Sequence, residues 1–87
     1  MPVLRYEVWD GPDAKGFWLA SKEQAEQRSK ILPDAELVHV IYATSLLDAM
    51  TLYHQWRGWE PYKPVPDFAY RPHTTEDAER QRSEGFS

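Results

Sequence analysis

Residues 36–45 decide the fold of this chain, and they read Glu36-Leu37-Val38-His39-Val40-Ile41-Tyr42-Ala43-Thr44-Ser45. Residues 37–42 are mostly β-branched or aromatic, which is the composition that strands favour. Ser45 follows them and stands three residues before Asp48, the spacing of a capped helix start. The stretch therefore predicts a strand over 36–44 and a helix that begins at Ser45.

The helix after this strand has one apolar side. Its apolar residues recur at three- and four-residue steps, the period of an α-helix, and they are Leu46, Ala49, Met50, Tyr53 and Trp56. Gly58 follows the last of them and suits the left-handed conformation in which many helices end. We therefore expect this helix to end at Gly58.

Before the central stretch, the sequence predicts a hairpin and a first helix. Residues 3–9 alternate between apolar and polar side chains, and residues 17–20 form a short aromatic strand beyond a loop rich in turn formers. Ser21 and Gln24 have the spacing of a capping box. Proline disfavours helix at the residue before it, so the helix is expected to end before Pro33.

The predicted order β-β-α-β-α defines a small α+β domain of two layers. We expect a three-stranded, mainly antiparallel sheet with both helices on one face. The composition changes near Lys63-Pro64. The chain is therefore expected to divide into an α+β domain over 1–63, an extended Pro-rich strap over 64–73 and a flexible polar tail over 74–87.

The tail over 74–87 is almost wholly polar. It has too little apolar surface to offset the entropy lost on ordering, so we expect disorder, or a frayed helix over 75–82. Deletion of the tail is then expected to leave the unfolding midpoint nearly unchanged.

The strand over 36–44 is apolar on both faces, which indicates a contact surface. Successive strand residues point to opposite faces. Val38, Val40 and Tyr42 are expected to meet the second helix, so that Leu37 and Ile41 point the other way. We expect the aromatic segment over 59–70, a second subunit or both to cover that face. The predicted interaction surface consists of Trp9, Trp18, Leu37, Ile41, Trp59 and Tyr62.

Composition and charge narrow the classes of partner. The 87 residues carry a formal net charge of −4 and no cysteine, which excludes disulfides and thiolate metal sites and disfavours nucleic acid or anionic membrane as a partner. A base-stacking platform of Trp9, Trp18 and Arg5 is a minor alternative, because Glu7 lies among them. The sequence has no apolar run long enough for a membrane span and no signal-peptide pattern. We expect a bacterial-type cytoplasmic protein.

Three histidines are the main candidates for catalysis or metal binding. His39 lies in the predicted strand, His54 lies beside the apolar side of the helix, and His73 lies in the strap. Their spacing does not fit a helical zinc site, and the loop from Asp10 to Asp13 lacks the alternating ligands of a calcium loop. Phosphate-binding and serine-nucleophile motifs are missing as well. We therefore predict neither a metal nor a cofactor.

Two functions from different classes follow. The first is a small, non-catalytic interaction or accessory protein that binds a protein partner or associates with itself. The alternative is a dimeric small-molecule binder or enzyme, with His39 or His54 in a cleft beside Tyr42, Tyr53 and Arg5. The sequence favours the first, because it holds no catalytic motif.

Overall fold

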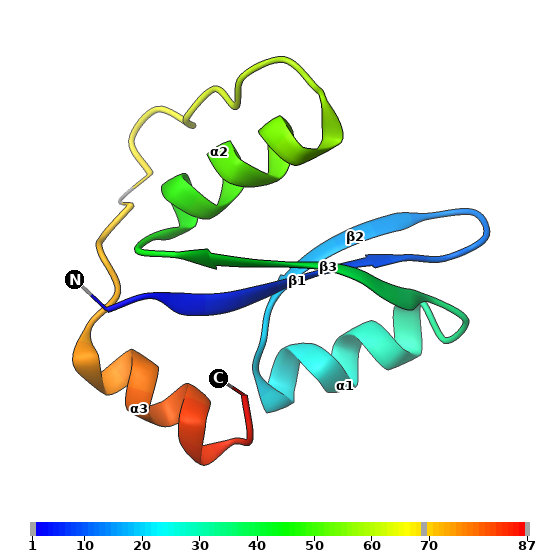
Figure 1. Cartoon of the computed structure of the whole chain (residues 1–87), viewed down its shortest axis with the longest axis horizontal. Coiled ribbons are helices and arrows are strands. Elements are labelled where there is room, and N and C mark those ends of the chain that lie inside the picture. Colours follow the sequence, from blue (N-terminus) through cyan, green and yellow to red (C-terminus); the bar gives the residue numbers. More distant parts are fainter. Residues whose placement is uncertain (1, 69, 87) are drawn as a thin grey trace.

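The computed structural model describes residues 2–68 and 70–86, which form a three-stranded antiparallel sheet and three helices (Figure 1). The elements are β1 (Leu4–Asp10), β2 (Lys15–Leu19), α1 (Lys22–Ile31), β3 (Glu36–Ala43), α2 (Leu46–Arg57) and α3 (Thr75–Ser83). The strand order is β2-β1-β3, so β1 is central. The predicted α+β class and antiparallel sheet are confirmed. Across the described residues, no helix has the length and apolar character needed to cross a membrane.

The ends of the two predicted helices are formed by the residues that the sequence indicates. Ser21 Oγ and Ser45 Oγ each accept a hydrogen bond from the backbone amide three residues ahead, both at 3.1 Å. These bonds satisfy amides that have no partner inside a helix. Gly58 follows α2 with a φ angle of 76°, the left-handed conformation that glycine adopts without strain.

The hydrophobic core lies between α2 and one face of the sheet. Tyr53 of α2 stacks on Phe17 of β2, with ring centroids 4.3 Å apart and planes 4° apart. Phe17 stacks in turn on Tyr6 of β1 at 5.4 Å. The buried residues of this core are Leu4, Tyr6, Val8, Ile41, Ala43, Ala49 and Tyr53. Stacked aromatic rings thus supply much of the buried surface of a small domain.

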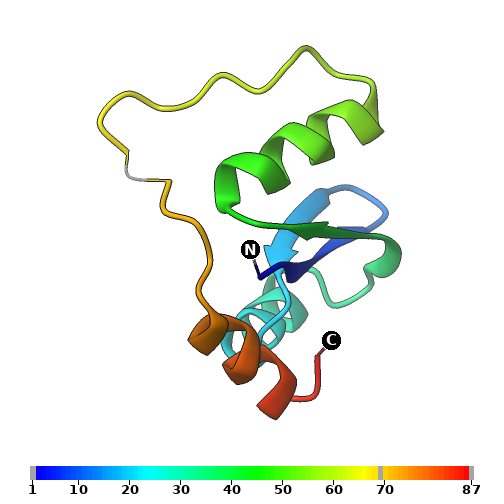
Figure 2. The same ribbon diagram turned by 60° about the vertical axis from the view of Figure 1, so that its left-hand side comes forward.

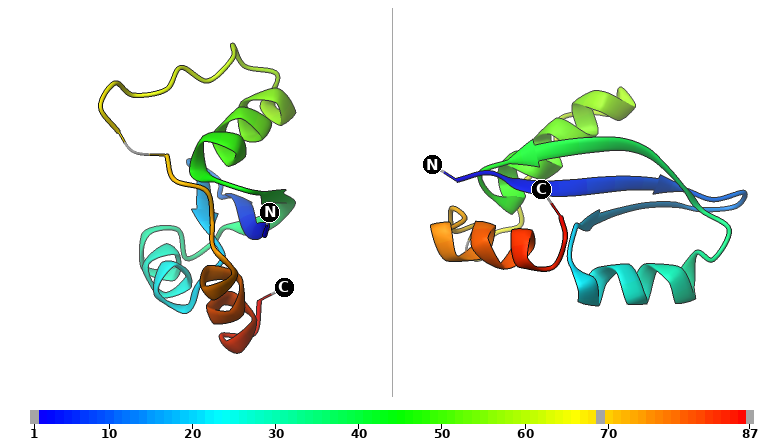
Figure 3. Two further views of the ribbon diagram at one scale, coloured as in Figure 1. Left: turned by 90° about the vertical axis from the view of Figure 1, so that its left-hand side faces the viewer. Right: turned by 60° about the horizontal axis from the view of Figure 1, so that its bottom comes forward.

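The helices α1 and α2 lie on opposite faces of the sheet, so the prediction of both helices on one face is wrong. The core places α2 on the face that carries Val8, and the next residue, Trp9, points to the other face. Arg28 of α1 holds its guanidinium 3.6 Å from the centre of the Trp9 ring. Figures 1 and 3 show the sheet between the two helices. Because α1 has no buried residue, it contacts the sheet by this cation–π pair rather than by an apolar stripe.

The predicted facing of β3 is wrong for Ile41 and right for Leu37. Tyr6 pairs with Ile41, and directly opposed residues share a face, so Ile41 points at α2. A β-bulge in the pairing next to Trp9 inserts one extra residue, which places Leu37 opposite Trp9 and away from α2. Leu37 and Ile41 were expected to share a face, but strict alternation does not hold across a bulge.

The segment over 74–86 contains a docked helix, where the sequence predicted a disordered tail or a frayed helix. Thr74 and Asp77 form a capping box, each side chain accepting from the amide of the other at 3.1 and 2.9 Å. Gln81 is 7% exposed. Its amide group accepts from the backbone nitrogen of Arg5 at 2.8 Å and donates to the carbonyls of Arg5 and Ala20. The hydrogen bonds of Gln81 therefore attach α3 to the sheet, beside the packing of Ala78 against the core.

The aromatic segment over 59–70 runs along α2 instead of crossing the sheet (Figure 2). Trp59 packs edge-on against Tyr53 with ring centroids 5.4 Å apart, and Tyr62 packs edge-on against His54 at 5.3 Å. The prediction that this segment covers the side chain of Ile41 is wrong, because α2 already occupies that face of the sheet.

An ion pair attaches Arg57, the last residue of α2, to Asp10, the last residue of β1. Arg57 donates hydrogen bonds from both terminal nitrogens to the carboxylate of Asp10, one of them at 3.0 Å. These hydrogen bonds are the main reason why the pKa of Asp10 is lowered from its ordinary value.

Replacement of Asp10 by asparagine is expected to reduce the loss of unfolding free energy that occurs as the pH falls. A carboxyl group whose pKa is lower in the folded state contributes stability that is complete above the unfolded pKa and lost as the pH falls through the folded one. The wild type should therefore lose more unfolding free energy than Asp10→Asn between about pH 5 and about pH 2, measured by urea denaturation. The exposed Asp13, in the loop that follows β1, is the matched control, and Asp13→Asn should lose as much unfolding free energy as the wild type over the same pH range. Equal losses in the wild type and Asp10→Asn would contradict this role.

Candidate functional site

The outer edge of β3 is the most accessible pairing surface of the sheet. β3 stands last in the strand order, and it is the longest strand that the structure describes. Its exposed apolar side chains are Leu37, Val38 and Tyr42, which are 41%, 45% and 50% exposed. In the right-hand view of Figure 3, β3 is the outermost strand and α2 lies behind it. An outer strand with exposed apolar side chains is a template for another strand.

The opposite edge of the sheet, β2, is protected by comparison. It has five residues and begins with Lys15, and both shortness and lysine discourage strand addition. The ring of Trp18 folds over Gly16, where an added Cβ atom would lie 1.9 Å from it. β3 carries one charged residue, Glu36, at its first position. The two edges therefore differ in length, charge and shape, and β3 is the one open to a partner.

A groove of about 430 Å³ lies beside this edge, between β3 and α2. His39 of β3 and Trp56 of α2 stack face to face in its wall, with ring centroids 4.7 Å apart and planes 4° apart. The residues that line it are His39, Val40, Ile41, Tyr42, Leu52, Gln55 and Trp56. None of these carries a carboxylate or an ammonium group, so the groove suits an apolar side chain. We call the exposed β3 residues and this groove the β3 edge site.

The structure does not bring the six predicted interaction residues together. Leu37 and Ile41 both belong to the β3 edge site, Leu37 as an exposed side chain of the edge and Ile41, which is 6% exposed, as part of the groove beneath α2. Trp9 and Trp18 are half-buried on the α1 face. Trp59 is exposed and Tyr62 is half-buried, and both lie along α2.

The predicted interaction surface includes only Leu37 and Ile41 of the β3 edge site and omits its other members. Val38, Val40 and Tyr42 were assigned to the contact with α2, which gave them a core role. The run of β-branched residues was the available signal, since a strand that is apolar on both faces has more apolar surface than one helix covers. The sequence alone does not show which of its two faces the helix takes.

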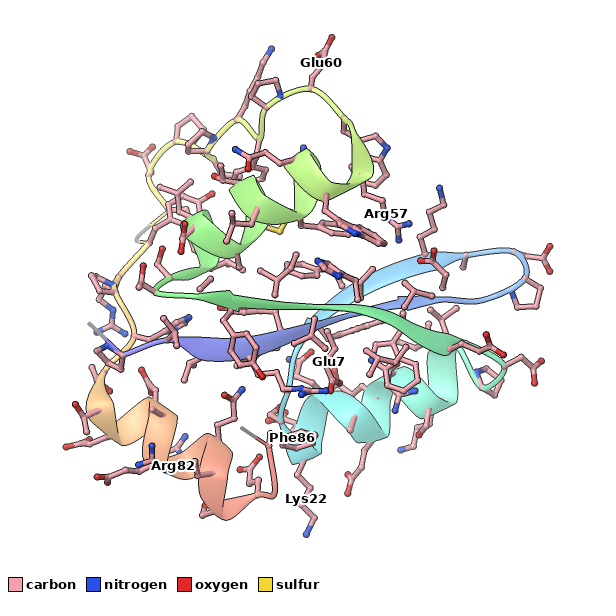
Figure 4. All side chains as sticks on the ribbon, in the orientation of Figure 1. Glu7, Lys22, Arg57, Glu60, Arg82 and Phe86 are labelled. Carbon is pink, nitrogen blue, oxygen red and sulfur yellow. The ribbon has the colours of Figure 1, made fainter. Side chains whose placement is uncertain are left out.

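The residues of the alternative catalytic hypothesis are dispersed. His39 and Tyr42 both line the groove, whereas Tyr53 is buried in the core. The ring nitrogen Nδ1 of His54 lies 2.9 Å from the carbonyl oxygen of Glu60. Arg5 donates to the carboxylate of Glu7 at 3.1 Å, in the space between the sheet and α1 (Figure 4). These side chains do not share one cleft.

His73 contacts the core, and sequence reasoning gave it no role there. Its Nε2 atom lies 2.8 Å from the hydroxyl of Tyr6, and its backbone amide donates to the carbonyl of Thr44 at 2.7 Å. Burial raises the pKa of Tyr6 to about 12 and lowers the pKa of His73. At neutral pH both groups are therefore neutral, which fits a structural hydrogen bond between β1 and the chain that leads into α3.

Comparison of the chain with protein-family models, curated proteins and solved structures finds no match in any of the three.

Proposed function

We propose that this chain is a small interaction protein that binds an extended protein segment along the open edge of β3. One observation carries the proposal. The strand that is least protected against pairing is also the strand with exposed apolar side chains, namely Leu37, Val38 and Tyr42. An added strand gains backbone hydrogen bonds along the whole edge and buries these side chains at the same time.

The groove beside the edge supports the same proposal. An added strand points alternate side chains to the two faces of the extended sheet. On the face that α2 covers, such side chains enter the groove next to the stacked rings of His39 and Trp56. Backbone pairing then supplies affinity, and the groove selects for apolar or aromatic residues in the partner.

Site-specific photocrosslinking tests the proposal in cells of the native host. A photoreactive phenylalanine analogue at Val38 should form a covalent adduct, because the side chain is exposed on the edge. Mass spectrometry of the adduct should locate the crosslink in an extended apolar segment, either of another protein or of a second copy of this chain.

Val65 provides the matched control, because it is a valine of similar exposure that lies outside the sheet. The same analogue at Val65 should not give the adduct found at Val38. Absence of any adduct at Val38, or the same adducts at both positions, would overturn the proposed function.

A further inference from the structure

We propose that the segment bound at the β3 edge site is β3 of a second copy, paired antiparallel about a two-fold axis at Val40. This inference rests on the proposed function, since it names the partner of the same site. The two sheets, each in the order β2-β1-β3, would join into one continuous sheet of six strands. A strand that pairs antiparallel with its own copy forms an isologous contact, the commonest type in soluble homodimers.

The facing of the side chains limits the register of residues 38–42 to those in which one of these residues lies opposite its own copy, and the pairing of exposed side chains then selects Val40. Directly opposed residues in an antiparallel pair share a face, so residues that point at α2 must meet residues that point at the second α2. With Val40 opposite its own copy, His39 meets Ile41, and both of these point at α2. In the same register Val38 meets Tyr42, so an exposed aliphatic side chain covers an exposed aromatic one twice.

This arrangement also separates the charges of two acidic chains. Each copy has a net charge of −4, but the only charged residue of β3 is Glu36. Antiparallel pairing carries the two Glu36 side chains to opposite ends, about 25 Å apart at roughly 3.3 Å per residue. Because that distance exceeds the screening length of about 8 Å in physiological salt, the repulsion between the two Glu36 side chains is small.

The groove is self-complementary in the same register. Trp56 is 40% exposed, and it stands beside His39 at the centre of the strand. The two-fold axis at Val40 places the two α2 helices on one face of the joined sheet, with their Trp56 rings on either side of the axis. Each ring then closes the open side of the other copy's groove. A second copy thus fits the edge and the groove together.

Light scattering and sedimentation of the full chain test the inference. From about 1 μM to about 1 mM, which spans the affinities of weak to moderate dimers, the wild type should shift to twice the monomer mass. Val40→Lys and Val40→Glu each place like charges opposite one another on the axis, so each dimer should dissociate about tenfold more readily or more. An equimolar mixture of the two variants should form a one-to-one heterodimer by native mass spectrometry.

Val65→Lys adds the same charge away from the edge and should keep the wild-type dimerisation. If Val40→Lys or Val40→Glu fails to fold, intermolecular contacts between the Val40 methyls of isotope-labelled and unlabelled wild type give the answer by NMR. A wild type that stays monomeric throughout, or a dimer that Val40→Lys leaves intact, would overturn the inference. In the monomeric case, a photocrosslink from Val38 to a different protein would still support the proposed function.

Discussion

Replacement of Gln81 by alanine is expected to cost about 2–4 kcal/mol of unfolding free energy. The side chain is buried and makes three hydrogen bonds to the backbones of Arg5 and Ala20. Alanine removes the side-chain partner of the Arg5 amide and of the Ala20 carbonyl, whereas the Arg5 carbonyl keeps the bond from the Ala20 amide. A buried backbone group that loses its partner costs more than the loss of an exposed hydrogen bond. Deletion of residues 74–87 should cause a comparable loss, in place of the neutral effect that the sequence predicts.

Two further variants make the test of Gln81 specific. Gln81→Glu keeps the shape and the acceptor for Arg5, but it replaces the donor to two carbonyls with an oxygen, so it should also destabilise the chain. Arg82→Ala changes the exposed next residue of the same helix and should alter stability by less than about 0.5 kcal/mol. Urea denaturation measures all three. Equal stabilities for Gln81→Ala and Arg82→Ala would show that α3 does not dock as described.

Replacement of Tyr53 by alanine is expected to cost about 3–5 kcal/mol, the usual cost of removing a buried aromatic ring. The ring packs between Phe17 and Trp59, and it connects α2 to the sheet. A loss of this size approaches the whole stability of a small domain. We expect most molecules of Tyr53→Ala to be unfolded at 37 °C, as measured by circular dichroism.

Tyr53→Phe is the matched control, because it keeps the ring and removes only the hydroxyl. That hydroxyl accepts a hydrogen bond from Arg57 at 3.3 Å, so its loss should cost about 0.5–1.5 kcal/mol. A cost below about 1.5 kcal/mol for Tyr53→Ala would contradict the packing of α2 on the sheet.

Much of the fold is predictable from local chemistry. The serine caps, the left-handed glycine after α2 and the strand over 36–43 each depend on residues close together in the sequence. Such signals survive because helix capping and strand preference are local properties. The α+β class and the antiparallel sheet follow from their order.

The wrong predictions all concern contacts between distant residues. The facing of β3 depends on its register against β1, which places Ile41 opposite the core residue Tyr6, and the bulge near Trp9 turns Leu37 to the other face. The docking of α3 depends on a single amide that binds backbone groups 76 residues away, which a count of apolar residues does not detect. The wrong facing of β3 also explains why the β3 edge site was not predicted, because Val38, Val40 and Tyr42 were expected to contact the second helix.

The hydrogen bonds between Gln81 and Arg5 have a consequence for how the chain folds during synthesis. β1 finds β2 soon after it is made, whereas its pairing with β3 needs about thirty more residues, and its contact with α3 needs 76. Contacts of such long sequence separation form late and slow the folding of a domain. Until Gln81 emerges from the ribosome, the backbone nitrogen of Arg5 lacks the side-chain acceptor that it has in the folded chain. A nascent chain that stalls inside α2 therefore presents the pair of β1 and β2 before α3 can dock on it. Such intermediates are prone to aggregate.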